Sequence, residues 1–273
     1  SSLSPLSKIN AVINSYALAR QKEIDTLQKT AEFRKEFIAD ISHELKTPIF
    51  SAQGYIHTLL DGAIEDKQVR LKFLKRAAKS LDSLDVLVQD LLTLNQMESG
   101  VIKFVFTDFD LKLLIEEVIE ELEHTASKRK IKIDFSFDHE KTYITHADQQ
   151  KIYRVCQNLI YNGVKYNHDG GEVKVSLKAS KTNLQVDIKD DGQGIPPDDL
   201  KRIFERFYRV EKSRNKKEGG PGLGLAIVKH ILDGHQSKIS VSSTVGKGSM
   251  FSFSLPLIKK EPIEQKAKAV QQE

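Results

Sequence analysis

An apolar stripe at helical spacing runs through residues 8–60, and it constrains the fold more than any other feature of this chain. Apolar or small residues recur at steps of mostly three or four, with polar and charged residues between them: Ile24, Leu27, Ala31, Ile38, Ile41, Leu45, Ala52, Ile56 and Leu59. Such steps place the side chains along one side of an α-helix. The stripe is much longer than a typical globular helix and therefore predicts a coiled coil or a helical bundle.

A second amphipathic stripe follows a turn signal at Gly62. Its steps alternate between three and four, and only one member is charged: Leu71, Leu74, Ala78, Leu81, Asp85, Val88 and Leu92. Ser99-Gly100 is expected to end this helix. Two such helices form an antiparallel hairpin that buries little surface alone, so we expect two chains to pair into a dimeric four-helix bundle.

From residue 101 onward, strand and helix patterns intermix. Alternating or apolar runs predict strands, and longer amphipathic runs predict helices. The expected strands are 104–106, 131–137, 173–177, 184–188, 239–241 and 249–255, and the expected helices are 110–128, 148–166 and 222–233. Several strands follow one another at hairpin spacing, which predicts an α/β sandwich with a mixed sheet. Residues 258–273 are rich in Lys, Glu and Gln and are expected to be disordered.

Composition excludes several classes of protein. The chain has 42 Lys and Arg against 38 Asp and Glu, and a net charge of +4 gives no support to nucleic-acid binding. A single cysteine, Cys156, excludes a disulfide framework within the chain. No apolar run is long enough to cross a bilayer, and residues 1–5 do not resemble a signal peptide. We therefore expect a soluble, cytoplasmic piece of a longer protein.

The first cluster with chemical potential lies on the first helix, at residues 42–48. His43 sits on the polar flank of the stripe, and a neutral imidazole is a nucleophile near pH 7. Glu44 can orient that imidazole or accept its proton, and Thr47 lies one helical turn further on the same face. Pro48 removes a main-chain N–H and loosens the helix. A lone histidine on a helix is more often structural, so the interpretation depends on the other clusters.

The second cluster lies on the expected helix 148–166. Asn158, Asn162, Lys165 and Tyr166 follow one another at helical steps. An amide oxygen is a suitable ligand for a hard cation, and a lysine can meet a phosphate. A solvated helix face explains the same pattern.

Three glycine clusters follow. Asp190-Asp191-Gly192-Gln193-Gly194 ends a strand with a carboxylate and a permissive turn, although an ordinary turn has the same composition. Residues 219–225 precede a helix, whose N-terminus can bind phosphate through main-chain N–H groups. Residues 246–249 are better explained as a hairpin turn. Between the first two clusters lie the aromatic segment 203–209 and the basic segment 211–218, which are either a lid or a solvated loop.

In order and spacing, these clusters resemble the cytoplasmic part of a sensor histidine kinase of two-component systems. The similarity covers residues 30–257 and includes six motifs of that family. They are the H box at 43–48, the N box at 158–166, the F box at 204–208 and the glycine boxes at 190–194, 220–224 and 246–248.

The resemblance implies a division into domains. A signalling helix would span 1–36, a dimerisation and histidine phosphotransfer domain 37–100, and a catalytic ATP-binding domain 101–257, with the tail at 258–273. The ATP-binding domain would be the Bergerat-type sandwich that this family shares with gyrase, the Hsp90 chaperones and the mismatch-repair ATPases.

The resemblance also implies roles for individual residues. His43 would be phosphorylated, Glu44 would be the base, and Thr47 would position water for dephosphorylation of the partner. Asn162 would bind Mg²⁺, and Asp190 would accept a hydrogen bond from the adenine amino group of ATP. The remaining matched positions would lie near the nucleotide: Asn158, Lys165, Tyr166, Gly192, Gly194, Arg209, Gly220, Gly222, Leu223 and Gly224.

The implied activity is ATP-dependent autophosphorylation of His43 and phosphoryl transfer to an aspartate of a response regulator receiver domain, with phosphatase activity toward that regulator. The implied assembly is a homodimer, anchored upstream in the inner or cytoplasmic membrane. A catalytically quiet, nucleotide-binding scaffold is the alternative, because Pro221 stands where the family has a small or hydroxyl residue. An ATP-driven clamp is disfavoured, since such ATPases need no phosphoacceptor helix.

Overall fold

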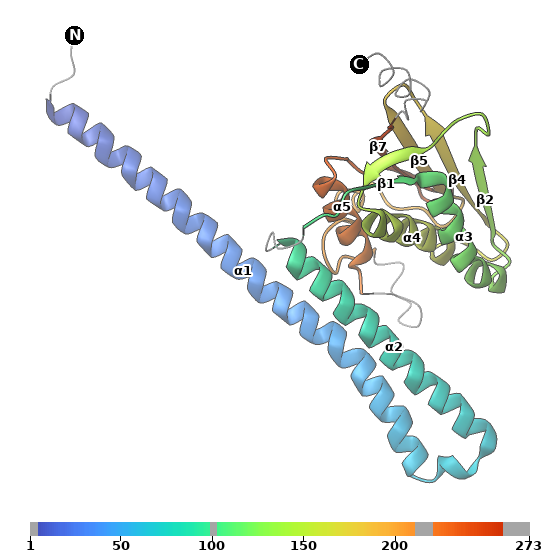
Figure 1. Ribbon diagram of the computed structural model, residues 1–273. Helices are drawn as coiled ribbons and strands as arrows, with labels where there is room; N and C mark the ends of the chain where they lie inside the picture. The colour runs from blue at the N-terminus through green and yellow to red at the C-terminus, as the bar shows by residue number, and fades with distance from the viewer. Residues whose placement is uncertain (1–4, 99–102, 211–220, 259–273) are drawn as a thin grey trace, which may run out of the picture. The chain divides into compact units, whose positions relative to one another are not determined.

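The computed structural model describes residues 5–98, 103–210 and 221–258 (Figure 1). The chain divides into two compact units, with the boundary between Leu87 and Val88. Each unit is described by itself below. The expected helix end at Ser99-Gly100 and the expected tail after Ile258 lie outside the described residues, and the domain bounds drawn from the sequence stay predictions.

The first unit contains the predicted helical hairpin. Helix α1 spans Pro5–Leu60, the short 3-10 helix η1 spans Ala63–Glu65, and α2 spans Lys67–Glu98 and continues past the unit boundary. The turn lies where the sequence predicted it, because Gly62 has a φ of 111° that favours glycine. Asp66 then begins α2 by accepting hydrogen bonds from the N–H groups of Gln68 and Val69, at 2.8 and 3.1 Å.

The helices of the hairpin carry apolar side chains on more than one face. Ala52, Leu59 and Ala77 are buried, and the ring of Tyr55 contacts that of Phe73 with centroids 5.6 Å apart. Many members of the predicted stripes remain exposed in the single chain: Ile24, Leu27, Ile38, Ile56, Leu71, Leu74 and Leu81. One chain therefore leaves much of the apolar surface of the hairpin uncovered.

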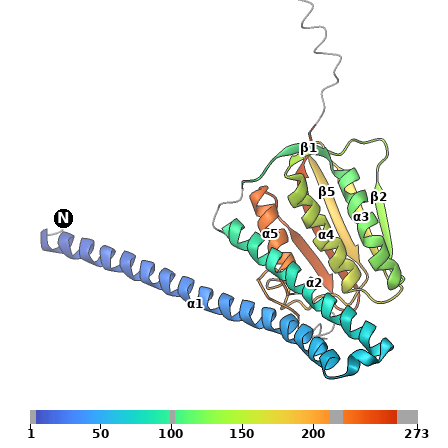
Figure 2. The ribbon, with the colours of Figure 1, turned by 60° about the horizontal axis from the view of Figure 1, so that its bottom comes forward.

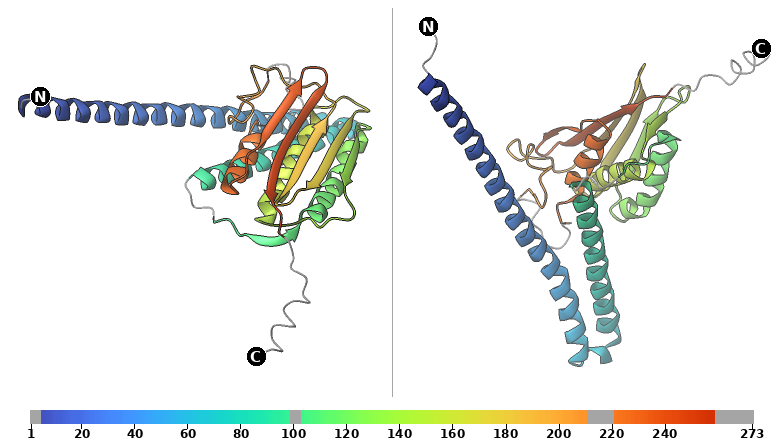
Figure 3. Two further views of the ribbon diagram at one scale, coloured as in Figure 1. Left: turned by 90° about the horizontal axis from the view of Figure 1, so that it is seen from above. Right: turned by 60° about the vertical axis from the view of Figure 1, so that its left-hand side comes forward.

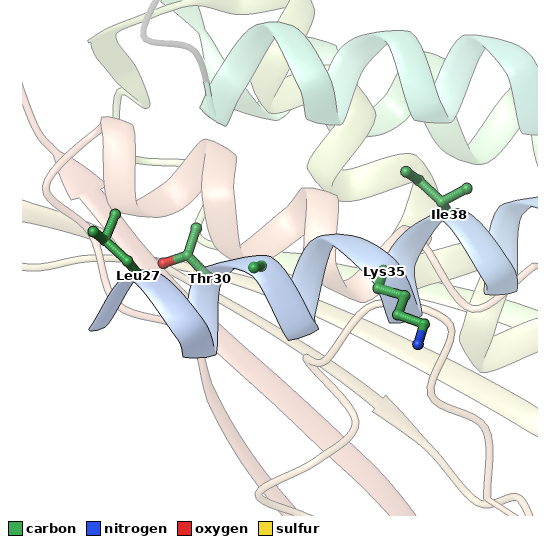
Figure 4. A pocket seen from close by; sticks show the side chains of 5 residues that line it. Leu27, Thr30, Lys35 and Ile38 are labelled. Carbon is green, nitrogen blue, oxygen red and sulfur yellow. The ribbon is translucent and has the colours of Figure 1, made fainter. Parts of the chain in front are cut away.

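A hollow on α1 belongs to this uncovered surface. It is lined by Leu27, Thr30, Ala31, Lys35 and Ile38, and Figure 4 shows these residues along one helix. Leu27 and Ile38 are each 63% exposed although both belong to the predicted stripe.

The second unit is built around a five-stranded sheet with the order β2-β4-β5-β7-β6. Its strands are β2 Lys132–Phe137, β4 Glu172–Ala179, β5 Asn183–Asp190, β6 Ser240–Thr244 and β7 Gly248–Pro256. Only the β2–β4 pair is parallel, so the sheet is mixed, as predicted. A small second sheet pairs β1 Thr107–Asp110 with β3 Ile144–Ala147.

Three helices cover one face of the large sheet (Figures 2 and 3). They are α3 Leu111–Lys128, α4 Gln149–Lys165 and α5 Gly224–Gly234. Alternate residues of β4 and β5 are buried, and α4, which packs on both strands, has buried side chains such as Ile152 and Leu159. The period of two in the strands and the apolar stripes of the helices thus produce one shared core.

The sequence analysis failed for the two strands of the small sheet. The expected strand 104–106 is wrong, because these residues form no strand and β1 begins at Thr107. The aromatic rings have other partners: Phe104 packs edge-on against His235, with centroids 5.0 Å apart, and Phe106 stacks on His146 at 5.6 Å. Strand β3 was not predicted from the sequence.

The last turns of α2 group with the second unit. Arg154 of α4 donates hydrogen bonds to Asp90 and, at 3.3 Å, to the hydroxyl of Thr93. Asp90 and Leu94 are buried. These contacts explain why the boundary of the unit lies inside α2 rather than at its end.

Among the described helices, none is both long and apolar enough to span a membrane.

The start of α4 offers a test of how this unit is held together. Asp148 is buried and accepts two main-chain hydrogen bonds, from Lys151 inside α4 at 3.1 Å and from Val105 in the preceding segment at 3.0 Å. We expect Asp148→Ala to lower the free energy of unfolding by about 2–3 kcal/mol, because a helix cap and a long-range bond are lost together. Urea unfolding followed by circular dichroism measures this loss.

Asp110→Ala is the matched control, since Asp110 caps α3 through a single bond to the N–H of Lys112 at 2.9 Å. It should cost about 1 kcal/mol. Equal losses in the two variants would contradict the bridging role of Asp148.

Candidate functional site

The candidate residues fall into two groups, one in each unit. His43, Glu44 and Thr47 lie on α1, and the other described candidates lie in the second unit.

His43 has a more exposed side chain than its neighbour Glu44. Its side chain is 81% exposed, and its Nδ1 lies 3.9 Å from Oε1 of Glu44. The hydroxyl of Thr47 donates to the main-chain oxygen of His43 at 3.3 Å. Pro48, inside the helix, offers no N–H to the carbonyl of Glu44. The arrangement is an open imidazole whose Nδ1 faces a carboxylate, which leaves Nε2 directed away from that carboxylate.

The second unit contains a pocket of about 90 Å³ between α4, the sheet and the segments that follow β5. Its lining combines apolar walls with a few polar groups: Asn162, Tyr166, Asp190, Gln193, Gly194, Ile195, Ile203, Tyr208, Arg209, Val210, Leu225, Ser249 and Phe251. This combination is typical of small-molecule sites, where apolar walls supply contact area and polar groups set orientation.

Asp190, the last residue of β5, is the buried acid of this pocket. The main-chain N–H groups of Gly192 and Ser249 both donate to its Oδ1, at 2.9 and 3.2 Å. Burial raises the pKa of the Asp190 carboxyl, and these two hydrogen bonds oppose that rise. Because both bonds go to Oδ1, Oδ2 retains the capacity to accept a donor from a ligand.

Helix α4 and its C-cap residue carry further candidates, and only some of them line the pocket. Asn162 and Tyr166 do, and burial raises the pKa of the Tyr166 hydroxyl. Asn158 donates from Nδ2 to the main-chain oxygen of Arg154 at 2.9 Å. The ammonium of Lys165 lies over the rings of Tyr166 and Tyr161, at 5.0 and 5.8 Å.

The aromatic segment and the second glycine cluster are attached to each other. The N–H of Phe207 donates to the main-chain oxygen of Gly222 at 3.1 Å. Gly222 has a φ of 76°, and the main chain of Phe207 occupies the space where a side chain would begin. Tyr208 donates to Asp199, and Arg202 lies 4.2 Å over its ring.

The structure thus brings together Asn162, Tyr166, Asp190, Gly194 and Arg209 around one pocket. The other described candidates of this unit do not line it: Asn158, Lys165, Gly192, Gly222, Leu223 and Gly224. Gly192 supports a lining residue, since its N–H donates to Asp190. Gly224 packs closely against the side-chain oxygen of Asn158, which also lies outside the lining. Gly220 lies outside the described residues.

Sequence reasoning missed most of the apolar walls. Ile203, Leu225 and Phe251 come from three separate segments, and no local pattern distinguishes them from other core residues. Ile195 directly follows the first glycine cluster and Ser249 is the last residue of the third, which is the one signal that pointed to them. The third glycine cluster forms the β6–β7 hairpin, as the simpler interpretation predicted.

Comparisons with known proteins agree with this arrangement. Residues 33–100 match the His Kinase A (phospho-acceptor) domain family. Residues 147–259 match the family described as histidine kinase-, DNA gyrase B- and HSP90-like ATPase.

Relatives with similar sequences are sensor kinases. The sensor histidine kinase WalK of Bacillus subtilis is 34% identical over 86% of this chain, and the chain spans 38% of its length. The sensor protein kinase WalK of Staphylococcus aureus has the same identity over the same share, and the chain spans 56% of it.

Solved structures of the same kind share the fold. The histidine kinase AdeS of Acinetobacter baumannii is 28% identical, with a TM-score of 0.63 over 80% of this chain and 98% of that chain. The histidine kinase ThkA, in a complex with the response regulator protein TrrA, has a TM-score of 0.60 over 90% of this chain and 68% of that one, at 23% identity. With a phospho-acceptor helix, an ATPase-type sandwich and these relatives, the chain belongs to the sensor histidine kinases.

Proposed function

We propose that this chain phosphorylates itself on His43 with ATP and passes the phosphoryl group to an aspartate of a response regulator receiver domain. One observation carries the proposal: a single chain combines an exposed imidazole that faces a carboxylate with a pocket built around a buried acid. The known relatives are longer than this chain, so the activity of the whole protein is part of the proposal.

The pocket suits the adenine ring of ATP. Oδ2 of Asp190 would accept a hydrogen bond from the exocyclic amino group, while Ile195, Ile203 and Phe251 would contact the ring faces and edges. Tyr166 and Arg209 line the same pocket.

The phosphates would lie toward the N-terminus of α5, which begins at Gly224. Gly220, Gly222 and Leu223 precede that helix in the chain, and Lys165 and Arg209 would supply positive charge. Leu223 is fully buried and would anchor the loop.

Asn162 fits the role of a Mg²⁺ ligand. It lines the pocket, it is half-buried, and its amide oxygen is a donor of the kind that hard cations prefer. Asn158 lies one helical turn before it. When bound, Mg²⁺ would neutralise charge on the phosphate oxygens.

His43 would act as the nucleophile through Nε2. A bond forms between Nε2 and the γ-phosphorus, the bond from that phosphorus to the bridging oxygen breaks, and ADP leaves with the electron pair. Glu44, 3.9 Å from Nδ1, would accept the Nδ1 proton, so that the product carries an uncharged imidazole ring on an anionic phosphoryl group. Thr47 would have a role in the phosphatase reaction, in which it would position the water that dephosphorylates the regulator. In this structure its hydroxyl donates to the main-chain oxygen of His43, one turn before it.

The uncovered apolar surface of the hairpin supports a homodimer. Exposed members of both stripes, and the hollow of Figure 4, would be covered by a second copy in a four-helix bundle. The complex of ThkA with TrrA supports a receiver domain as the second partner. The proposal also includes the domain bounds 1–36, 37–100 and 101–257, a cytoplasmic location and a membrane anchor upstream.

A nucleotide-binding scaffold without kinase activity is the second candidate. Pro221 favours it, because proline offers no N–H to a phosphate directly before Gly222.

Transfer of label from γ-labelled ATP distinguishes the two candidates. We expect wild type to acquire a label that is lost in acid and kept in base, as a phosphoramidate should be, and His43→Gln to acquire none. His57→Gln, another exposed histidine of α1, is the control and should be labelled normally. A wild type that binds ATP without label supports the scaffold, and label in His43→Gln would show that the acceptor is another residue.

Asp190→Asn tests the recognition of adenine. The amide would keep an oxygen for Gly192 and Ser249 but place an NH₂ group where Oδ2 was, so a donor would face the adenine amino group. We expect ATP affinity to fall by roughly 1–3 kcal/mol, or about fivefold to 150-fold, and GTP to compete better than in wild type. Calorimetric titration measures the affinities for ATP and for GTP. An unchanged preference for ATP would contradict the assignment of Asp190.

The raised pKa of Asp190 predicts a pH dependence of binding. In the ionised carboxylate Oδ2 can accept from the amino group, whereas a proton on Oδ2 would turn it into a donor. A raised pKa means that Asp190 is protonated at a higher pH than an ordinary aspartate, which titrates at about 4. ATP affinity should therefore be full at neutral pH and decline as the pH falls toward the raised pKa. The decline should be absent in Asp190→Asn, and an identical profile in both proteins would contradict the prediction.

A further inference from the structure

The turn that follows Asp190 is attached to the β6–β7 hairpin at two points. The main-chain oxygen of Gln193 accepts the N–H of Gly246 at 2.8 Å. The N–H of Ile195 donates to a side chain, the hydroxyl of Ser243 in β6, also at 2.8 Å. The second attachment depends on one hydroxyl group, so it can be removed without altering the main chain.

Ser243 uses its whole hydrogen-bonding capacity inside the protein. Its Oγ donates to the main-chain oxygen of Gly248 at 2.9 Å and lies 3.0 Å from Oγ of Ser249, its register partner in β7. A hydroxyl has one proton and two lone pairs. Since the proton goes to Gly248, the lone pairs accept from Ile195 and from the hydroxyl of Ser249.

Two hydrogen-bond partners of Ser243 are residues of the pocket lining. Ile195 forms a wall, and Ser249 both lines the pocket and donates its N–H to Asp190. The segments are in close contact, because the main chain of Thr244 occupies the space where a side chain at Gly194 would begin. A shift of Ile195 relative to β7 therefore changes the width of the pocket at its buried acid.

We infer that Ser243 is a positioning residue for nucleotide binding, which fixes the wall residue Ile195 against β7, the strand whose Ser249 donates to Asp190. Ser243 does not line the pocket itself and acts through Ile195, Gly248 and Ser249. The inference rests on the proposed function, because the ligand whose fit is affected is ATP.

The test compares three variants of the full chain for ATP binding by calorimetric titration. Ser243→Ala should weaken ATP binding roughly tenfold, since the N–H of Ile195 loses its partner. Ser243→Thr keeps the hydroxyl and suits a strand, so it should bind ATP within about twofold of wild type. Ser242→Ala changes the exposed neighbour on the other side of β6 and should bind as wild type does.

A second measurement needs no nucleotide. Hydrogen exchange at the Ile195 amide should become faster in Ser243→Ala and stay slow in Ser243→Thr and Ser242→Ala. Together with weaker ATP binding, this pattern supports the inference. A general loss of stability would speed exchange throughout the unit instead, including α3, and would show a purely structural role.

The proposed function and the inference fail in different ways. A wild type that binds no ATP contradicts the proposed function before any variant is compared. A wild type that binds ATP, with Ser243→Ala binding equally well, overturns only the role of Ser243. Failure of Ser243→Thr to restore binding also overturns it, because the hydroxyl would then not be the group that matters.

Discussion

The pocket depends on hydrogen bonds from two distant segments of main chain to one buried carboxylate. Gly192 follows Asp190 directly, whereas Ser249 comes from the last strand of the sheet, and both donate to the same oxygen. Burying a carboxylate without such donors costs several kcal/mol, so these bonds are required if the acid is to remain ionised. Because they also fix the glycine turn against β7, the walls formed by Ile195 and Phe251 take their places from the same interaction.

The two proposed sites have opposite requirements for exposure to solvent. The proposed nucleophile must be reachable for its reaction, and the side chain of His43 is largely exposed, with the Glu44 carboxylate 3.9 Å from its Nδ1. The proposed acceptor for adenine must be shielded from water, and Asp190 is buried in a pocket with apolar walls. The proposed phosphoacceptor needs accessibility and the pocket needs enclosure, which suits them to a helix surface and to a helix-covered sheet, respectively.

Most of the fold could be predicted from the sequence, because its signals are local. The long stripes of α1 and α2 and the alternation in β4 and β5 are periodic patterns that the structure follows. The failure at 104–106 has a physical cause: Phe104 and Phe106 are apolar because they pack on His235 and His146, not because they belong to a strand. The pocket walls could not be predicted, since Ile203 and Phe251 meet only after the chain has folded.

The main-chain origin of the donors to Asp190 has a consequence for mutational tolerance. Any residue except proline supplies an N–H, so the bond from position 249 to Asp190 places no demand on the side chain found there. Glycine positions nearby have no such freedom. A Cβ at Gly192 would come within 2.6 Å of the main-chain oxygen of Tyr166, and one at Gly248 would meet the Cα of Asp191 at 2.8 Å. A random library of this chain should therefore lose the pocket through a few added methyl groups more readily than through many exchanges of polar side chains.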